Sequence, residues 1–143
     1  MSIFVSYSSR SSDIANEIAY KLQDLNYSVW IDRTKEHVKW TKEDFDIVSK
    51  AVASSSVFIC FVDKEYCNDK NTKTELSFAH AQKTKVIPIM MEKETNHSID
   101  PVLLNYHKFI AFKNSDAFET WPDELFKELL TAIKLNLNSN VKI

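Results

Sequence analysis

Polar side chains follow each of the first three apolar segments of this chain, at the point where the segment ends. The apolar segments cover residues 3–7, 29–31 and 57–62. The polar groups that follow them are Ser8, Ser9 and Arg10, then Asp32, then Asp63. In an alternating α/β domain, ligands bind just beyond the carboxyl ends of the strands. The sequence therefore predicts that hydroxyl, guanidinium and carboxylate groups meet at one ligand-binding edge.

Glycine is missing from the chain, although average usage of about 7% would place roughly ten in a sequence of this length. The phosphate loop of P-loop NTPases, the GxGxxG turn of dinucleotide-binding domains and the GxSxG elbow of hydrolases all need glycine. At those positions the backbone approaches a phosphate closely or takes a positive φ. The sequence therefore argues against kinases, P-loop NTPases, Rossmann dehydrogenases and α/β-hydrolases. Positive-φ positions must fall to residues such as Asn26, which follows a helical segment.

Histidine and cysteine show no spacing that is typical of a metal site. The four histidines are scattered without an HxxxH pair, and the two cysteines form no CxxC motif. Cys60 lies in an apolar segment and Cys67 in a polar one, so we expect two thiols and no disulfide framework. The sequence therefore predicts no metal and no resident cofactor.

The charge of the chain gives no sign of a polyanionic partner. A formal net charge of -2 leaves no basic excess to bind a nucleic-acid backbone or an anionic membrane surface. No apolar segment approaches the ~20 residues that span a bilayer, and Met1 leads directly into the first strand without a signal peptide. We therefore expect a cytoplasmic protein that binds neither nucleic acid nor membrane.

Hydrophobic periodicity predicts alternating strands and helices in a single domain, residues 1–143. Short apolar segments typical of strands cover residues 3–7, 27–31, 57–62, 86–91 and 109–112. Apolar residues at helical spacing mark the segments 14–25, 45–52, 76–83 and 125–137. A segment that is apolar throughout, such as 57–62, is typical of a strand buried on both faces of a parallel sheet. The pattern predicts an α/β protein with a flavodoxin-like, doubly wound, five-stranded parallel sheet and helices on both faces.

Four segments of the chain, in this order, resemble the Toll/interleukin-1 receptor (TIR) domain family. They are Ile3-Phe4-Val5-Ser6-Tyr7-Ser8, Tyr27-Ser28-Val29-Trp30-Ile31-Asp32, Thr74-Glu75-Leu76 and Val86-Ile87-Pro88-Ile89. The resemblance covers nearly the whole chain and implies the TIR fold, which is itself flavodoxin-like. The family contains two functional classes: scaffolds that assemble signalling complexes, and enzymes that cleave NAD at the nicotinamide glycosidic bond.

For the enzymatic class, the resemblance implies that Glu75 is the catalytic residue. Enzymatic members carry a glutamate at this position, on the helix before the fourth strand. Its carboxylate would hold the ribose hydroxyls and counter the positive charge of an oxocarbenium-like ribose. The residue type alone favours a different interpretation, a solvated helix carboxylate.

One position departs from the enzymatic pattern. Many enzymatic members carry a tryptophan four residues before the glutamate, where this chain has Asn71. The segment 66–70 reads as a polar loop and offers no replacement. We therefore expect the carboxylate of Glu75 to be less desolvated than is usual for the family.

The resemblance also implies substrate-binding residues around the glutamate. Trp40 lies where related NADases place an aromatic ring to stack on the substrate, or it forms a hydrophobic staple with Phe45 of the following helix. Asp32 resembles the family's aspartate at the end of the second strand, where it orients the next loop or caps a turn. Three residues would bind the phosphates through hydroxyls, amides and one guanidinium, or else cap the first helix: Ser8, Ser9 and Arg10.

The implied function is that of a TIR-domain NAD nucleosidase in innate-immune or cell-death-type signalling. Its products would be nicotinamide and either ADP-ribose or a cyclic ADP-ribose, with NAD as the substrate and not a cofactor. Other TIR domains would be partners in a head-to-tail assembly, with loop 33–39 of one protomer covering the glutamate of the next.

The main alternative is a non-catalytic adaptor or scaffold module, although loop 33–39 lacks the Pro-Gly pair that scaffold members often carry. A response regulator would need an acidic pair after the first strand to bind Mg²⁺, and serines stand there. A nucleoside deoxyribosyltransferase-like enzyme, which also uses a glutamate on a glycosidic bond, is a further alternative.

Overall fold

The computed structural model describes residues 2–31, 40–92, 101–110, 112–113, 116–117 and 123–139. The strands are β1 (Ser2–Tyr7), β2 (Ser28–Ile31), β3 (Val57–Val62), β4 (Lys85–Met90), β5 (Phe109–Ile110), β6 (Phe112–Lys113) and β7 (Asp116–Ala117). The α-helices are α1 (Ser12–Asp24), α2 (Lys42–Ala53), α3 (Lys64–Asn68), α4 (Lys70–Ala81) and α5 (Asp123–Ser139), and the 3₁₀ helices are η1 (Ser9–Ser11) and η3 (Pro101–Asn105). Within these ranges no helix is both long enough and apolar enough to cross a membrane.

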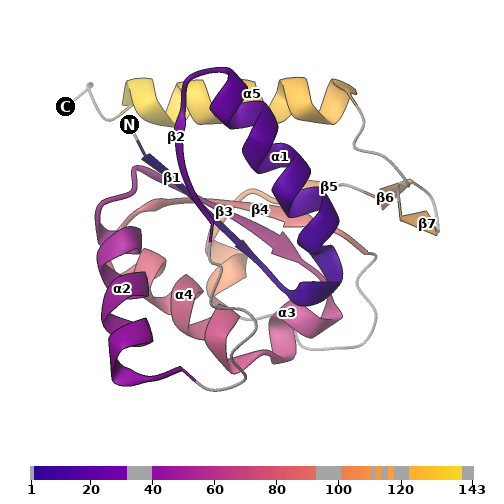
Figure 1. Cartoon of the computed structure of the whole chain (residues 1–143). Helices are drawn as coiled ribbons and strands as arrows, with labels where there is room; N and C mark the ends of the chain where they lie inside the picture. The colour runs from indigo at the N-terminus through magenta and orange to yellow at the C-terminus, as the bar shows by residue number, and fades with distance from the viewer. Residues whose placement is uncertain are drawn as a thin grey trace.

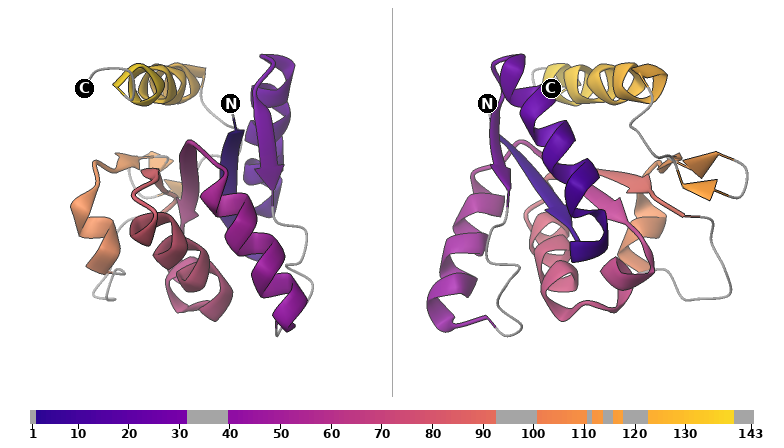
Figure 2. Two further views of the ribbon diagram at one scale, coloured as in Figure 1. Left: turned by 90° about the vertical axis from the view of Figure 1, so that its left-hand side faces the viewer. Right: turned by 45° about the vertical axis from the view of Figure 1, so that its right-hand side comes forward.

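A five-stranded sheet in the order β2-β1-β3-β4-β5 forms the centre of the molecule, and all its strand pairs are parallel (Figure 1). Helices α1 and α5 cover one face, and α2, α3 and α4 cover the other (Figure 2). The short strands β6 and β7 pair with each other outside this sheet. The doubly wound, flavodoxin-like architecture predicted from the sequence is confirmed.

Alternation along β1 decides which side chains meet which helices. Ile3 and Val5 belong to the core beneath α1 and α5, whereas Phe4 belongs to the core beneath α2 and α4. Because successive side chains of a strand point to opposite faces, Ser6 falls on the same face as Phe4. Ser6 therefore places a hydroxyl group inside a largely apolar layer, on the side of α3 and α4.

Two helices end in left-handed residues that are not glycine. Asn26 has a φ of 70° and Lys83 a φ of 59°. After α1, the amides of Asn26 and Tyr27 donate to the carbonyls of Gln23 and Leu22, which is the pattern of a Schellman motif. The corresponding amides after α4 donate to His80 and Ala79 in the same way. The prediction for Asn26 is confirmed, whereas Lys83, which the sequence placed on a helix, lies beyond its end.

The segment 66–70 is not the polar loop that the sequence predicted. It holds the end of α3 and the first residue of α4. The side chain of Asp63 caps α3 by accepting a hydrogen bond from the amide of Tyr66, and Asp69 caps α4 through the amide of Asn71. Two successive N-caps allow a polar segment to form helix without a continuous apolar stripe.

Candidate functional site

Asp63 accepts hydrogen bonds from residues that follow β1 and β3. Its carboxylate lies 5% exposed and accepts hydrogen bonds from the hydroxyls of Ser8, at 2.8 and 2.9 Å, and Ser11, at 2.6 Å. It also accepts the amide of Tyr66 at 2.7 Å. Hydroxyl and carboxylate groups that follow β1 and β3 therefore meet, and Asp63 joins the loop after β1 to the start of α3. No hydroxyl partner of Asp63 could be predicted from the sequence, because these donors lie more than 50 positions away.

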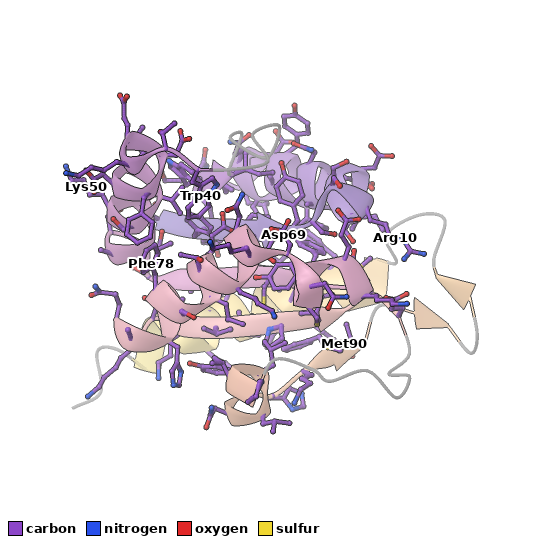
Figure 3. The ribbon with its side chains drawn as sticks, turned by 90° about the horizontal axis from the view of Figure 1, so that it is seen from below. Arg10, Trp40, Lys50, Asp69, Phe78 and Met90 are labelled. Atoms are coloured by element: carbon purple, nitrogen blue, oxygen red, sulfur yellow. The ribbon has the colours of Figure 1, made fainter. Side chains whose placement is uncertain are left out.

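The phosphate-binding candidates of the first loop point in different directions. The Ser8 hydroxyl is buried and directed at Asp63, whereas Ser9 is exposed and donates to Glu65 Oε1 at 2.6 Å. Arg10 is also exposed, and lies at the far end of the view from Trp40 (Figure 3). No serine side chain caps η1 or α1, so the helix-capping interpretation of this loop is wrong.

Glu75 is a buried carboxylate at the meeting point of three elements. It has no exposed surface, although it lies in the middle of α4. Ser6 of β1 donates its hydroxyl proton to Glu75 Oε1 across 2.6 Å. The Tyr66 hydroxyl of α3 lies 2.8 Å from the same Ser6 oxygen. The interpretation of Glu75 as a solvated helix residue is wrong, and so is the expectation that Asn71 leaves it poorly desolvated.

Tyr66 is as deeply buried as its partners. Burial raises the pKa of its hydroxyl well above the ordinary value, and the neighbouring Cys60 and Glu75 raise that pKa further. Tyr66 therefore keeps its proton across the physiological pH range. Neither Ser6 nor Tyr66 was predicted from the sequence as a site residue; the available signal was a serine at an inward position of an apolar strand.

Trp40 begins α2. Thr41 is the N-cap and forms a capping box with Asp44, so Trp40 is the residue before the cap and Phe45 is the fourth helical residue. The rings of Trp40 and Phe45 meet edge-on at 6.3 Å, and Phe45 in turn meets Phe78 of α4 at 5.0 Å. The staple interpretation is confirmed. The indole N–H is buried and donates to no group among the described residues.

Replacing Trp40 by alanine should lower the free energy of unfolding through loss of this staple. A double-mutant cycle with Phe45→Ala should show a coupling of about 0.5 to 1.5 kcal/mol, as for other aromatic pairs, in denaturant unfolding. Strictly additive effects would contradict the staple. If the ring also stacks on a substrate, Trp40→Ala raises the KM as well.

Asp32 and loop 33–39 lie outside the described residues. Among the residues that the structure describes, no group of three His, Cys, Asp or Glu side chains could hold a metal ion. A pocket of about 350 Å³ opens on the outer face of α4, and Glu75 does not line it. Its lining residues are Asn68, Lys70, Lys73, Thr74, Ser77 and Phe78.

The sequence as a whole matches a known family. A family model for the TIR domain covers residues 3–130. The chain belongs to the TIR domain family. Glu75 is therefore the buried carboxylate of a TIR fold, on the helix before β4. A comparison with curated proteins finds no match.

Solved structures agree with the TIR fold at low sequence identity. The TIR domain of the Toll-related receptor TRR-2 from Hydra magnipapillata is 12% identical, with a TM-score of 0.58, and covers 99% of this chain and 98% of its own. The CMP N-glycosidase BcmB of Clostridium botulinum is 18% identical, with a TM-score of 0.57. The match covers 94% of this chain and 99% of the glycosidase. The TIR domains of the activated Roq1 resistosome are 14% identical, with a TM-score of 0.50. The match covers 97% of this chain and 74% of the Roq1 chain. These likenesses show the fold alone.

Proposed function

We propose that this TIR domain cleaves the nicotinamide–ribose bond of NAD, with Glu75 as the catalytic residue. The observation that carries the proposal is a carboxylate with 0% exposure that a buried hydroxyl holds in place. Glutamate is rarely buried, because removing its charge from water destabilises the folded state. The structure of a helix gives no reason for a buried glutamate in its middle. A buried, oriented carboxylate is what stabilisation of a developing cation requires.

Cleavage of the nicotinamide–ribose bond requires few other groups from the protein. Nicotinamide leaves NAD as a neutral ring from a cationic nitrogen, so the departing group needs no general acid. Positive charge develops on the ribose as the bond breaks, and a carboxylate beside it lowers the energy of that transition state. The ribosyl group is then captured by water, which gives ADP-ribose, or by a nitrogen of its own adenine, which gives a cyclic product.

The remaining substrate contacts come from the ends of the strands. In this proposal the exposed Ser9 and Arg10, together with the amides around Ser8, bind the phosphates. Asp32 orients the loop that follows β2, and Trp40 stacks on a ring of the substrate. One structural neighbour is named as an N-glycosidase of CMP, which supports the use of a related fold on the same class of bond.

The alternative is an adaptor TIR domain that acts only by assembling with other TIR domains. Incubating the purified chain with NAD and measuring nicotinamide by chromatography separates the two. Nicotinamide release above the uncatalysed rate supports the enzyme, and the ratio of ADP-ribose to cyclic product shows how the ribosyl group is captured. Assembly without nicotinamide release would overturn the proposal in favour of a cytoplasmic signalling scaffold.

Specific activity should increase with protein concentration. Glu75 has no exposed surface in the single chain, so NAD reaches it only in a conformation in which a covering group has moved. A second protomer that binds this conformation shifts the population toward it. A head-to-tail contact of this kind is heterologous and can extend into a filament.

A mixing experiment checks the assembly. Glu75→Ala protein and an Arg33→Glu/Lys35→Glu loop variant, each inactive alone, should partly restore nicotinamide release together. One interface in the mixture then has both an intact loop and an intact glutamate. No recovery, at concentrations where the wild type is active, would show that each chain contains a complete site.

A further inference from the structure

Three buried polar side chains from β1, α3 and α4 are connected in series by hydrogen bonds. The Tyr66 hydroxyl, the Ser6 hydroxyl and Glu75 Oε1 are joined by contacts of 2.8 and 2.6 Å. Ser6 and Glu75 are fully buried, and Tyr66 is 1% exposed. Ser6 lies 60 positions from Tyr66 and 69 positions from Glu75 in the sequence, so only the fold brings it to them.

The number of protons decides the direction of these bonds. A serine hydroxyl has one proton, and Ser6 donates it to Glu75. The contact between Ser6 and Tyr66 must then use the tyrosine proton, with the serine oxygen as acceptor. The three groups form a chain in which each donation strengthens the next, because a hydroxyl that accepts a hydrogen bond becomes a better donor.

Tyr66 is fixed at both backbone groups as well as at its hydroxyl. Its amide donates to Asp63 Oδ1 at 2.7 Å, and its carbonyl accepts the hydroxyl of Thr72 at 2.6 Å. The tyrosine ring therefore connects the Asp63 network to the glutamate. Because its pKa is raised, the hydroxyl remains a donor at neutral pH.

We propose that Tyr66 and Ser6 are positioning residues, which hold the Glu75 carboxylate ionised and in one orientation for the developing ribose cation. The proposal rests on the function proposed above. Neither residue contacts the substrate; both act through Glu75. A hydrogen bond to a charged group favours its charged form, so the chain keeps a buried carboxylate ready to stabilise positive charge.

The test compares Tyr66→Phe and Ser6→Ala with two matched controls. Tyr66→Phe removes one oxygen and keeps the ring, so the core is preserved. Tyr106→Phe removes a hydroxyl that contacts the exposed His80, and Ser55→Ala removes a buried hydroxyl that donates to a backbone carbonyl of α2. Tyr66→Phe and Ser6→Ala should lower the kcat for nicotinamide release by about tenfold with the KM unchanged, whereas the controls should not.

A second measurement separates positioning from general damage to the fold. In a Glu75→Gln background, Tyr66→Phe should cause no further loss of the residual rate, because its effect passes through the missing carboxylate. Full activity in Tyr66→Phe, or an equal loss in the Glu75→Gln background, would overturn the positioning role while leaving the NADase function standing. A wild-type chain that releases no nicotinamide would overturn the function itself.

Discussion

Replacing Glu75 by glutamine should reduce nicotinamide release by at least about 10²-fold, since loss of a preorganised charge-stabilising group typically has this effect. Glutamine keeps the shape of the side chain and can still accept the hydrogen bond from Ser6, but it carries no negative charge. The ribose cation then loses the group that opposes its charge. The measurement is kcat from initial rates of nicotinamide formation at saturating NAD.

A matched control isolates the role of this one carboxylate. Glu17→Gln removes a charge from an exposed position of α1 and should leave the rate unchanged. Circular dichroism and thermal unfolding of Glu75→Gln establish that the variant is folded. Wild-type turnover in a folded Glu75→Gln variant would remove Glu75 from the mechanism.

Asp63→Ala should produce the largest loss of stability, about 3 to 5 kcal/mol of the free energy of unfolding. The substitution removes the acceptor of two hydroxyl donors, from Ser8 and Ser11, and of one backbone amide. Ser8 has no exposed surface, so its hydroxyl cannot turn to water instead. Loss of the α3 cap alone accounts for about 1 kcal/mol of the total. Denaturant unfolding followed by circular dichroism gives the value.

The control for this prediction is an aspartate without such partners. Asp46 lies exposed on α2, and Asp46→Ala should change the free energy of unfolding by no more than about 0.5 kcal/mol. An Asp63→Ala variant as stable as the Asp46→Ala variant would show that the network around Asp63 contributes little. Because Asp63 also holds the amide of Tyr66, we expect its loss to lower activity as well.

Local patterns of the sequence were sufficient for several features of this chain. The apolar segments predicted all five strands of the sheet and their parallel arrangement. Asn26 was identified as a left-handed residue because it follows a helical segment in a chain without glycine. The spacing of Trp40 and Phe45 indicated a staple as one of two interpretations. Each of these features depends on residues within a few positions of one another, so periodicity and residue type are enough.

The surroundings of the candidate glutamate were decided by the tertiary structure. A resemblance to the TIR family pointed to Glu75, but the residue type and its helix predicted an exposed side chain. Its hydroxyl partner is Ser6, 69 positions away, and Ser6 meets α4 because β1 is an interior strand of the sheet. Asp63 likewise finds its hydroxyl donors across 52 and 55 positions. The sequence by itself determined the elements and their order; which polar groups share a buried site depends on long-range pairing, for which periodicity carries no signal.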